Sequence, residues 1–377
     1  MRHILIAAAA VLGTSAISAQ APTFYYPAPP ESSYSIAKDV PYGGTGADAL
    51  RMDVYRPSAG KPGPTLIFFN IASGANRSNF FYAPWAKLAA SKGITAILPD
   101  LRDASFAQDF AALTAHLATL TSDPTIDRDA LAVYAGSGNV YRALPLVQDP
   151  KLTAVKAAVM YYGGAEVSRF RLDLPLLFVR AGLDRPPVNR TISELVSAAV
   201  GQNAPVTLLN HASGYHAFEI FNDDEATREV MDRTIEFVKR TTAPGYQAAV
   251  KRGLLEATAA GHVATGQFPQ AAQAYGELVA ARPEDSRLRL AYGEALLGAG
   301  QFAAACSELE KLKGKGLGPR DLGVPAARAC MQKGDGDAAV AWLQSIPERF
   351  RPASLEKDPI FAPIRERADF KALFSKR

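Results

Sequence analysis

Cysteine and histidine are scarce in this chain, and their scarcity limits the kinds of site it can hold. The 377 residues include two cysteines, Cys306 and Cys330, and five scattered histidines. No Cys-x-x-Cys and no His-Glu-x-x-His motif occurs, so the sequence predicts neither a structural nor a catalytic metal site. In an oxidising compartment the two cysteines can form a disulfide, and the alternative is a pair of small buried apolar side chains.

A large net charge and a second long apolar run are also lacking. The formal net charge of +4 gives no electrostatic reason to expect nucleic acid or an anionic membrane as a partner. The densest basic run, residues 311–315, lies in a glycine-rich stretch and is interpreted as a solvated loop rather than a phosphate-binding patch. Beyond the N-terminus no apolar run reaches the roughly 20 residues that cross a bilayer, so stable membrane insertion is not expected.

The N-terminus has the pattern of a secretory signal peptide. Residues 1–3 give a short basic start, residues 4–17 are apolar but short for a bilayer span, and small residues follow. Cleavage is predicted after Ala19, because a cut after Ala21 would leave Pro22 immediately downstream. Residues 1–19 are therefore predicted to be a signal peptide and the mature protein to be exported, either periplasmic or secreted. A membrane anchor or a buried helix is the alternative.

The next part of the chain, residues 20–245, alternates short Val/Ile/Leu-rich runs with helical patterns. That alternation is typical of a mainly parallel sheet with helices on both faces. A Pro- and aromatic-rich lead-in, residues 22–34, is expected to be irregular. Strands are expected at 50–57, 64–70, 95–101, 131–137, 155–163, 175–182 and 205–212, and helices at 82–93, 106–120 and 229–242.

From about residue 252 the strand pattern stops and a 34-residue period begins. Gly266, Gly300 and Gly334 are spaced by 34 residues, and further positions keep the same register: Ala271, Ala305 and Ala339, then Tyr275, Leu309 and Leu343. With Gly293 and Pro283 at two more positions, this pattern resembles the tetratricopeptide repeat, a pair of antiparallel helices. A generic alanine-rich bundle would not keep so strict a register.

The period divides this region into three repeats, at residues 252–285, 286–319 and 320–353. The third copy departs from the pattern, because Gly336 replaces the turn aromatic and Arg351 stands at the position of the terminal proline. We expect it to act as a cap, followed by a helical tail over residues 354–377. Repeats of this kind usually bind a peptide or a partner protein.

A glycine-rich stretch, "AGSGN", follows the expected strand at 131–137 and places Ser137 directly at its end. In α/β-hydrolases a nucleophilic serine stands on such a strand-to-helix turn, with small residues two before and two after it. Here Ala135 and Asn139 hold those positions, which relaxes the usual Gly-x-Ser-x-Gly. A plain strand-to-helix loop is the alternative.

Two later loops supply the partners that a nucleophilic serine needs, a base and a carboxylate that orients it. Asp184 follows the strand expected at 175–182, and His216 follows the one at 205–212. The carboxyl ends of parallel strands lie along one rim of the sheet, so these side chains can converge. Asp184 could instead begin a turn, and His211 is a rival base that is expected only to end its strand.

The stretches "IDRDALAVYAGS", "FVRAGLD" and "GYHAFEIF" resemble the dienelactone hydrolase-like and esterase branch of the α/β-hydrolase fold, over roughly residues 40–240. The resemblance implies Ser137 as nucleophile, His216 as general base and then acid, and Asp184 as the orienting carboxylate. Dienelactone hydrolases proper use a cysteine nucleophile, so a serine here favours an esterase.

An acyl transfer also needs two hydrogen-bond donors for the oxyanion. The backbone N–H of Gly138 is expected to be one. The second is expected from Ile71, in a loop where family members often carry His-Gly and this chain has Asn70-Ile71. Asn70 is expected to hydrogen-bond the loop in place of the histidine. The aromatic residues 80–82 beyond it form either a pocket wall or part of the core.

The sequence therefore predicts an exported serine hydrolase acting on small-molecule esters, or on lactones or peptides, without a cofactor. Two alternatives remain open. The first is an inactive hydrolase scaffold whose repeats bind a protein or peptide, and the second is an acyltransferase that uses the same triad.

Overall fold

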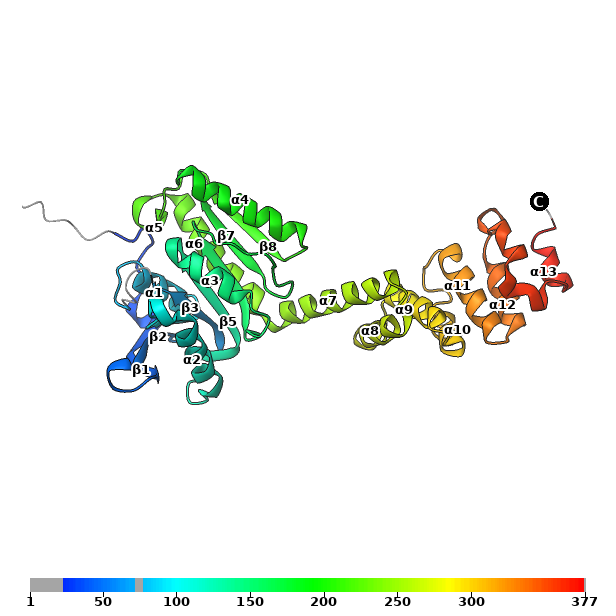
Figure 1. Cartoon of the computed structure of the whole chain (residues 1–377), viewed down its shortest axis with the longest axis horizontal. Coiled ribbons are helices and arrows are strands. Elements are labelled where there is room, and N and C mark those ends of the chain that lie inside the picture. Colours follow the sequence, from blue (N-terminus) through cyan, green and yellow to red (C-terminus); the bar gives the residue numbers. More distant parts are fainter. Residues whose placement is uncertain (1–22, 72–76, 376–377) are drawn as a thin grey trace, which may run out of the picture. The chain divides into compact units, whose positions relative to one another are not determined.

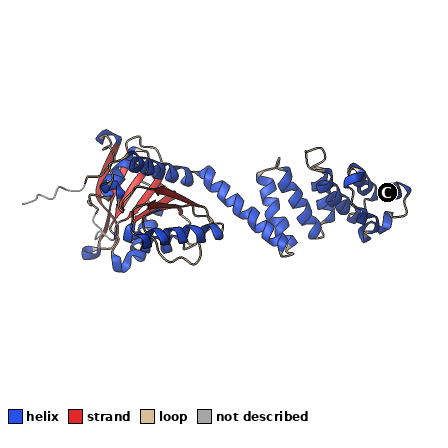
Figure 2. Cartoon of the chain, turned by 90° about the horizontal axis from the view of Figure 1, so that it is seen from above, coloured by secondary structure: helices blue, strands red, loops and turns tan. Residues whose placement is uncertain are grey.

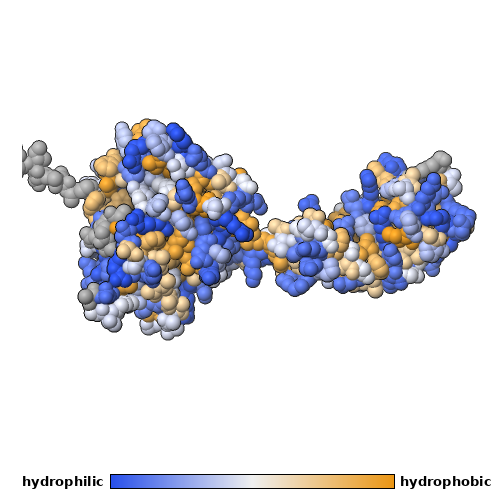
Figure 3. All heavy atoms as spheres, in the orientation of Figure 1, coloured by the Kyte–Doolittle hydropathy of each residue, from blue (hydrophilic) through white to orange (hydrophobic). Residues whose placement is uncertain are grey.

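The computed structural model describes residues 23–71 and 77–375, which form two compact units divided between Pro244 and Gly245. The predicted signal peptide, residues 1–19, and the middle of the loop after residue 71 lie outside the described residues. On the face shown in Figure 3, hydrophilic and hydrophobic residues are interspersed over both units. No helix in the described part of the chain is long and apolar enough to span a bilayer.

Unit 1 is built on one eight-stranded sheet in the order β1-β2-β4-β3-β5-β6-β7-β8 (Figure 1). The β1–β2 and β2–β4 pairs are antiparallel, and the five other neighbouring pairs are parallel. The mainly parallel sheet predicted from the sequence is confirmed. Its strands are β1 (Tyr34–Gly43), β2 (Leu50–Pro57), β3 (Gly63–Phe69), β4 (Thr95–Pro99), β5 (Ile126–Gly136), β6 (Val155–Tyr161), β7 (Leu176–Ala181) and β8 (Val206–His211).

Helices cover both faces of this sheet, as predicted (Figure 2). Along β3 the side chains alternate, so that Ile67 and Phe69 pack into one hydrophobic cluster with α2, α3 and α4, while Leu66 and Phe68 pack into another with α1 and α6. The helices are α1 (Tyr82–Ser91), α2 (Phe106–Thr119), α3 (Val140–Val147), α4 (Pro186–Gly201), α5 (Phe218–Phe221) and α6 (Glu225–Thr242).

Strand β1 and helix α4 are the two longest elements of unit 1 that the sequence patterns do not predict, and these patterns assign no ranges to the short helices α3 and α5 either. Strand β1 is an edge strand whose burial does not alternate, and its register shifts between Ala37 and Val40, where Asp39 has a φ of 58°. That irregularity removes the period-two pattern by which strands are recognised. Helix α4 begins at Pro186, and proline is well suited to the first turn of a helix although a proline pair also marks turns.

Unit 2 is helical and follows the 34-residue period. The turn glycines Gly266, Gly300 and Gly334 all have positive φ, which glycine adopts at little cost. The alanines of the repeat, Ala271, Ala305 and Ala339, are fully buried where helices pack. The helices are α7 (Pro244–Ala264), α8 (Phe268–Ala281), α9 (Ser286–Gly298), α10 (Phe302–Glu310), α11 (Pro319–Gln332), α12 (Gly336–Ser345) and α13 (Ala368–Ala372).

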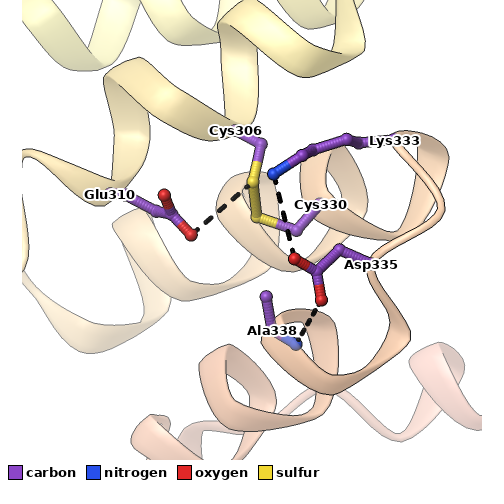
Figure 4. Close-up of a disulfide and its surroundings, with 6 residues drawn as sticks. All are labelled: Cys306, Glu310, Cys330, Lys333, Asp335 and Ala338. Carbon is purple, nitrogen blue, oxygen red and sulfur yellow. Dashed lines mark hydrogen bonds and ion pairs between the residues drawn. A yellow bond between two sulfur atoms is a disulfide. The ribbon is translucent and has the colours of Figure 1, made fainter.

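A disulfide joins Cys306 of α10 to Cys330 of α11, with a Cα–Cα distance of 4.9 Å (Figure 4). Of the two alternatives left open by the sequence, the structure has the disulfide. A carboxylate oxygen of Glu310 lies 3.8 Å from the Cys306 Sγ. Cys306, Glu310 and Cys330 are the one group of three potential metal ligands found within the described ranges. Because the two sulfurs are bonded to each other, neither is a thiolate that could bind a metal.

The third repeat is joined to the C-terminal tail by Arg351, the residue at the proline position. Its buried guanidinium donates to the carbonyl oxygens of Leu343 at 3.0 Å, Ile346 at 2.9 Å and Leu373 at 2.6 Å. These carbonyls lie at the end of α12 and just after α13, so the arginine links the last repeat helix to the tail. The tail itself consists mostly of short 3₁₀ turns rather than of α-helix.

Candidate active site

Ser137 stands on a sharp turn between β5 and α3, as the sequence predicts. Its φ is +55°, in the left-handed region that non-glycine residues rarely adopt, and a single 3₁₀ turn over Ser137–Asn139 leads into α3. The chain after β6 passes close behind it. A Cβ on Gly163 would lie 2.5 Å from the carbonyl oxygen of Ser137, so this approach requires glycine.

The structure brings Ser137, His216 and Asp184 together. Ser137 Oγ lies 2.8 Å from His216 Nε2, and His216 Nδ1 lies 2.6 Å from Asp184 Oδ2. The Asp184 side chain is 1% exposed, and its other oxygen accepts the Arg185 backbone N–H at 2.7 Å. With both oxygens bound, the carboxylate holds the proton of the imidazole on Nδ1 and leaves Nε2 as the acceptor facing the serine.

The rival base, His211, is placed elsewhere. It is the last residue of β8 and is buried, with Nε2 2.9 Å from Thr227 Oγ1 and 3.3 Å from Asp224 Oδ1. Both partners belong to the start of α6. His211 therefore ends its strand, as expected from the sequence, and it also contacts the start of α6.

Asn139, at the position where the common motif has a second glycine, is accommodated by a specific partner. Its side chain is buried and Nδ2 donates to Tyr82 Oη at 2.6 Å. Tyr82 begins α1, so this bond ties the turn that carries Ser137 to the neighbouring helix. No local sequence pattern indicates the pair, because the two residues are 57 positions apart.

A fully buried carboxyl group, Glu219, lies three residues after His216. Its Oε1 accepts from Trp85 Nε1 at 3.3 Å and from Tyr134 Oη at 3.2 Å, and Tyr162 Oη lies 3.0 Å from Oε2. Burial raises the pKa of Glu219 to about 7. Tyr162 in turn contacts the imidazole, with ring centroids 4.7 Å apart.

Glu219 thus fastens the loop of His216 to α1, to β5 and to the residue after β6. It belongs to the quoted stretch "GYHAFEIF", yet its position there does not distinguish it from an exposed glutamate. Sequence reasoning missed Glu219 because its role depends on three donors that are far away along the chain, Trp85, Tyr134 and Tyr162.

The predicted oxyanion donors are only partly described by the structure. Gly138 follows Ser137 in the turn, and Asn70 and Ile71 are buried at the end of β3. Residues 72–76 lie outside the described residues, so the donation by Ile71 and the hydrogen bond of Asn70 to this loop remain predictions.

Arg77, which follows this loop directly, is held by three carboxylates. Its Nη2 lies 2.7 Å from Asp39 Oδ1 and its Nε lies 2.9 Å from Asp100 Oδ1. Its Nη1 pairs with the buried Asp53. Burial opposes its charge, but these partners together raise the pKa of Arg77 above its ordinary value. The end of the loop is therefore fixed to β1, to β2 and to the residue after β4.

A pocket of about 270 Å³ opens at Ser137, and we call it the inner pocket. The aromatic residues 80–82 all line it, with Phe80 half exposed. Tyr82 also belongs to the hydrophobic cluster on the α1 face of the sheet and Phe81 packs against that cluster, so this segment is both pocket wall and core. Its lining consists of Asn79, Phe80, Phe81, Tyr82, Gly136, Ser137, Asn139, Tyr162, His216 and Ala217.

Comparison with known proteins adds a family match for the helical region. Residues 262–320 match the family model described as tetratricopeptide repeat. No curated protein matches the chain.

Solved structures similar to this chain cover a little over half of it. A dienelactone hydrolase-like promiscuous phosphotriesterase from metagenomic libraries has 17% identity and a TM-score of 0.43, over 55% of this chain and 99% of its own. An α/β-hydrolase from a Medee basin deep-sea metagenome has 15% identity and a TM-score of 0.46, over 56% and 99%. A Rhizomucor miehei esterase has 12% identity and a TM-score of 0.46, over 55% and 84%.

The strand order, the antiparallel β2 and the serine on a left-handed turn after β5 are the features of an α/β-hydrolase sheet. The chain therefore carries an N-terminal unit with the α/β-hydrolase fold and a C-terminal unit with tetratricopeptide repeats.

Proposed function

We propose that this chain is an exported serine hydrolase that cleaves carboxylic esters through Ser137, His216 and Asp184. The observation that carries the proposal is the continuous path from Ser137 Oγ through both imidazole nitrogens to the buried Asp184 carboxylate, at 2.8 and 2.6 Å. This is the geometry that activates a serine hydroxyl. Export rests on the N-terminal pattern alone, and the test is whether the chain secreted from a bacterial host begins at Gln20 by intact mass.

In the proposed reaction, His216 Nε2 takes the hydroxyl proton of Ser137 while Oγ attacks the ester carbonyl carbon. The negative oxygen of the tetrahedral intermediate accepts from the backbone N–H groups of Gly138 and Ile71. His216 then gives the proton to the departing alcohol oxygen, which leaves an acyl group on Ser137. Water attacks that acyl-enzyme with His216 again as base, and the acid is released with the serine restored. Every step is completed by these residues and water, so no cofactor is required.

Labelling with a fluorophosphonate probe, read by intact mass, tests this proposal. We expect one adduct per chain, lost in Ser137→Ala and kept in Ser193→Ala, whose hydroxyl only donates to the Asn189 carbonyl oxygen. A folded protein that takes no adduct would overturn the proposal. An active protein that transfers its acyl group to an added alcohol in preference to water would be an acyltransferase.

A second function is favoured by the match of residues 262–320 to the tetratricopeptide repeat. Such repeats present a surface to a peptide or a partner protein. If Ser137 does not react, the repeats become the functional part, and the hydrolase unit becomes a scaffold for them.

A further inference from the structure

Two hollows flank His216, and the proposed function uses one of them. The inner pocket contains both Ser137 and His216. A second hollow of about 570 Å³, which we call the outer hollow, is lined by Leu183, Asp184, Arg185, Tyr215, His216 and Phe221. His216 is the residue that lines both hollows, so groups bound in the two would lie on either side of its imidazole ring.

Five of the ten residues that line the inner pocket carry rings, and several of its polar atoms are already hydrogen-bonded within the protein. Asn139 Nδ2 donates to Tyr82 Oη, Tyr162 Oη is bound to Glu219, and Asn79 Oδ1 accepts the Phe81 backbone N–H at 2.8 Å. Its described lining has no Lys, Arg, Asp or Glu. A charged group entering this pocket would lose its hydration without a partner of opposite charge. The inner pocket therefore suits a small, neutral, apolar group.

The outer hollow exposes large apolar side chains to water. Leu183, Tyr215 and Phe221 are 53%, 54% and 63% exposed and lie together around it. Clustered exposed apolar side chains of this size mark a surface that binds something apolar. Arg185 stands beside them with its side chain 75% exposed and its Nε 3.8 Å from Asp184 Oδ1. A flat aromatic ring is the apolar group that both the two aromatic side chains and a guanidinium can contact.

The chemistry decides which part of an ester enters which hollow. The acyl group becomes bonded to Ser137, which lines the inner pocket, whereas the alcohol oxygen must receive its proton from His216, which borders the outer hollow as well. We propose that the substrates are esters of a small, neutral, apolar acid with an alcohol that carries an aromatic ring, and that the outer hollow binds the ring. This inference rests on the proposed function of Ser137.

Three butyrate esters test it: benzyl, cyclohexylmethyl and ethyl. The first two differ in the flatness and electron distribution of the ring, and the ethyl ester has no ring. We expect kcat/KM for the benzyl ester to exceed that of the cyclohexylmethyl ester by about 5-fold and that of the ethyl ester by more. A benzyl ester of succinic acid, whose acyl group keeps a free carboxylate, should be poorer than benzyl butyrate by about 100-fold.

Variants of the outer hollow locate the effect. In Phe221→Ala and in Tyr215→Ala the benzyl-to-ethyl ratio of kcat/KM is expected to fall by about 5-fold, chiefly through KM, because a ring contact is lost. Phe350→Ala, a matched exposed phenylalanine in unit 2, should leave the ratio unchanged. In Arg185→Gln the preference for benzyl over cyclohexylmethyl should shrink while both ring esters stay ahead of ethyl.

The outcomes separate this inference from the function on which it depends. If Ser137 takes the fluorophosphonate and hydrolyses the esters without preferring benzyl, or if Phe221→Ala keeps the full preference, the outer hollow does not bind the alcohol and the inference is wrong. If Ser137 takes no adduct and no ester is cleaved, the proposed hydrolase function fails and the inference fails with it.

Discussion

At the scale of single residues, the side chains around Ser137 are fixed by hydrogen bonds and ring contacts to other groups of the protein. Asp184 uses both carboxylate oxygens, one on His216 and one on the Arg185 N–H. Asn139 is bonded to Tyr82, and Tyr162 connects the imidazole ring to Glu219. Side chains fixed in this way lose little freedom when a substrate binds, which is the condition for a site that is ready to react.

Glu219 makes the stability of unit 1 depend on pH. Its pKa is about 7 in the folded protein against an ordinary value of 4.5, because it is fully buried. Between these values the folded state keeps the proton and the unfolded state loses it, so the free energy of unfolding falls as pH rises through this window and is level above it. A shift of this size corresponds to about 3 kcal/mol.

Glu219→Gln should remove this dependence. The amide resembles the protonated acid, with its oxygen available to Trp85 and Tyr134 and its nitrogen able to donate to Tyr162 Oη. Relative to wild type, we expect the variant to gain about 3 kcal/mol in unfolding free energy between pH 4.5 and 8. Urea unfolding followed by Trp85 fluorescence in a Trp342→Phe background measures it, with the exposed Glu194→Gln as control. Parallel pH profiles for wild type and Glu219→Gln would contradict the assignment.

At the scale of elements, unit 1 places its reactive groups on loops at the carboxyl ends of parallel strands in one half of the sheet. Ser137 follows β5, Asp184 follows β7 and His216 follows β8, while the loop after β3 enters the same edge. Parallel strands bring these ends together because all of them point to one rim of the sheet. The loop after β3 differs from the others in being tied at its far end by Arg77.

Arg77→Lys should therefore impair the reaction more than the fold. Lysine keeps the charge but cannot reach Asp39, Asp53 and Asp100 at once in the way a guanidinium does. The loop that carries the proposed Ile71 donor would be less well positioned, and we expect kcat for ethyl butyrate to fall by about 10-fold with little change in KM.

A second arginine of the same unit provides the matched control for this prediction. Arg56→Lys alters a pair with Asp123 that belongs to β2 and the turn before β5, and it should leave kcat unchanged. Unaltered kcat in a folded Arg77→Lys protein would mean that the three carboxylates do not position the loop.

At the scale of the whole molecule, the two units draw their stability from different sources. Unit 1 buries alternating strand side chains between two layers of helices. Unit 2 packs helix pairs of small residues in series and adds a covalent link between the second and third repeats. Each repeat contacts mainly the repeats next to it. A covalent link between the second and third repeats therefore prevents these two from coming apart when their shared packing is lost.

Removal of that link should destabilise unit 2 and spare the chemistry. The disulfide closes a segment with a sequence separation of 24, for which loop-closure entropy predicts about 3 kcal/mol. We expect Cys306→Ala with Cys330→Ala to lower the unfolding temperature reported by Trp342 in α12, with kcat at Ser137 unchanged. An unfolding temperature equal to that of wild type would show that helix packing alone holds the repeats.

Much of this protein is determined by its sequence alone. Short apolar runs and period-3.6 patterns predict most of the sheet and its helices, and the 34-residue register predicts the helix pairs. The order Ser137, Asp184, His216, each after a predicted strand, indicates the site. These features depend on neighbours along the chain or on the rule that parallel strands end at one rim, so a linear pattern carries them.

Other features were decided only by the tertiary structure. Edge strand β1 has no alternating pattern because its register against β2 shifts between Ala37 and Val40. The bonds of Asn139 to Tyr82 and of Glu219 to Trp85 join residues 57 and 134 positions apart. The cysteine pairing, the three carboxylates on Arg77 and the two hollows beside His216 also depend on which segments meet in space. Hydrogen bonds and pockets are short-range in distance but not in sequence, so only the folded chain shows which residues share them.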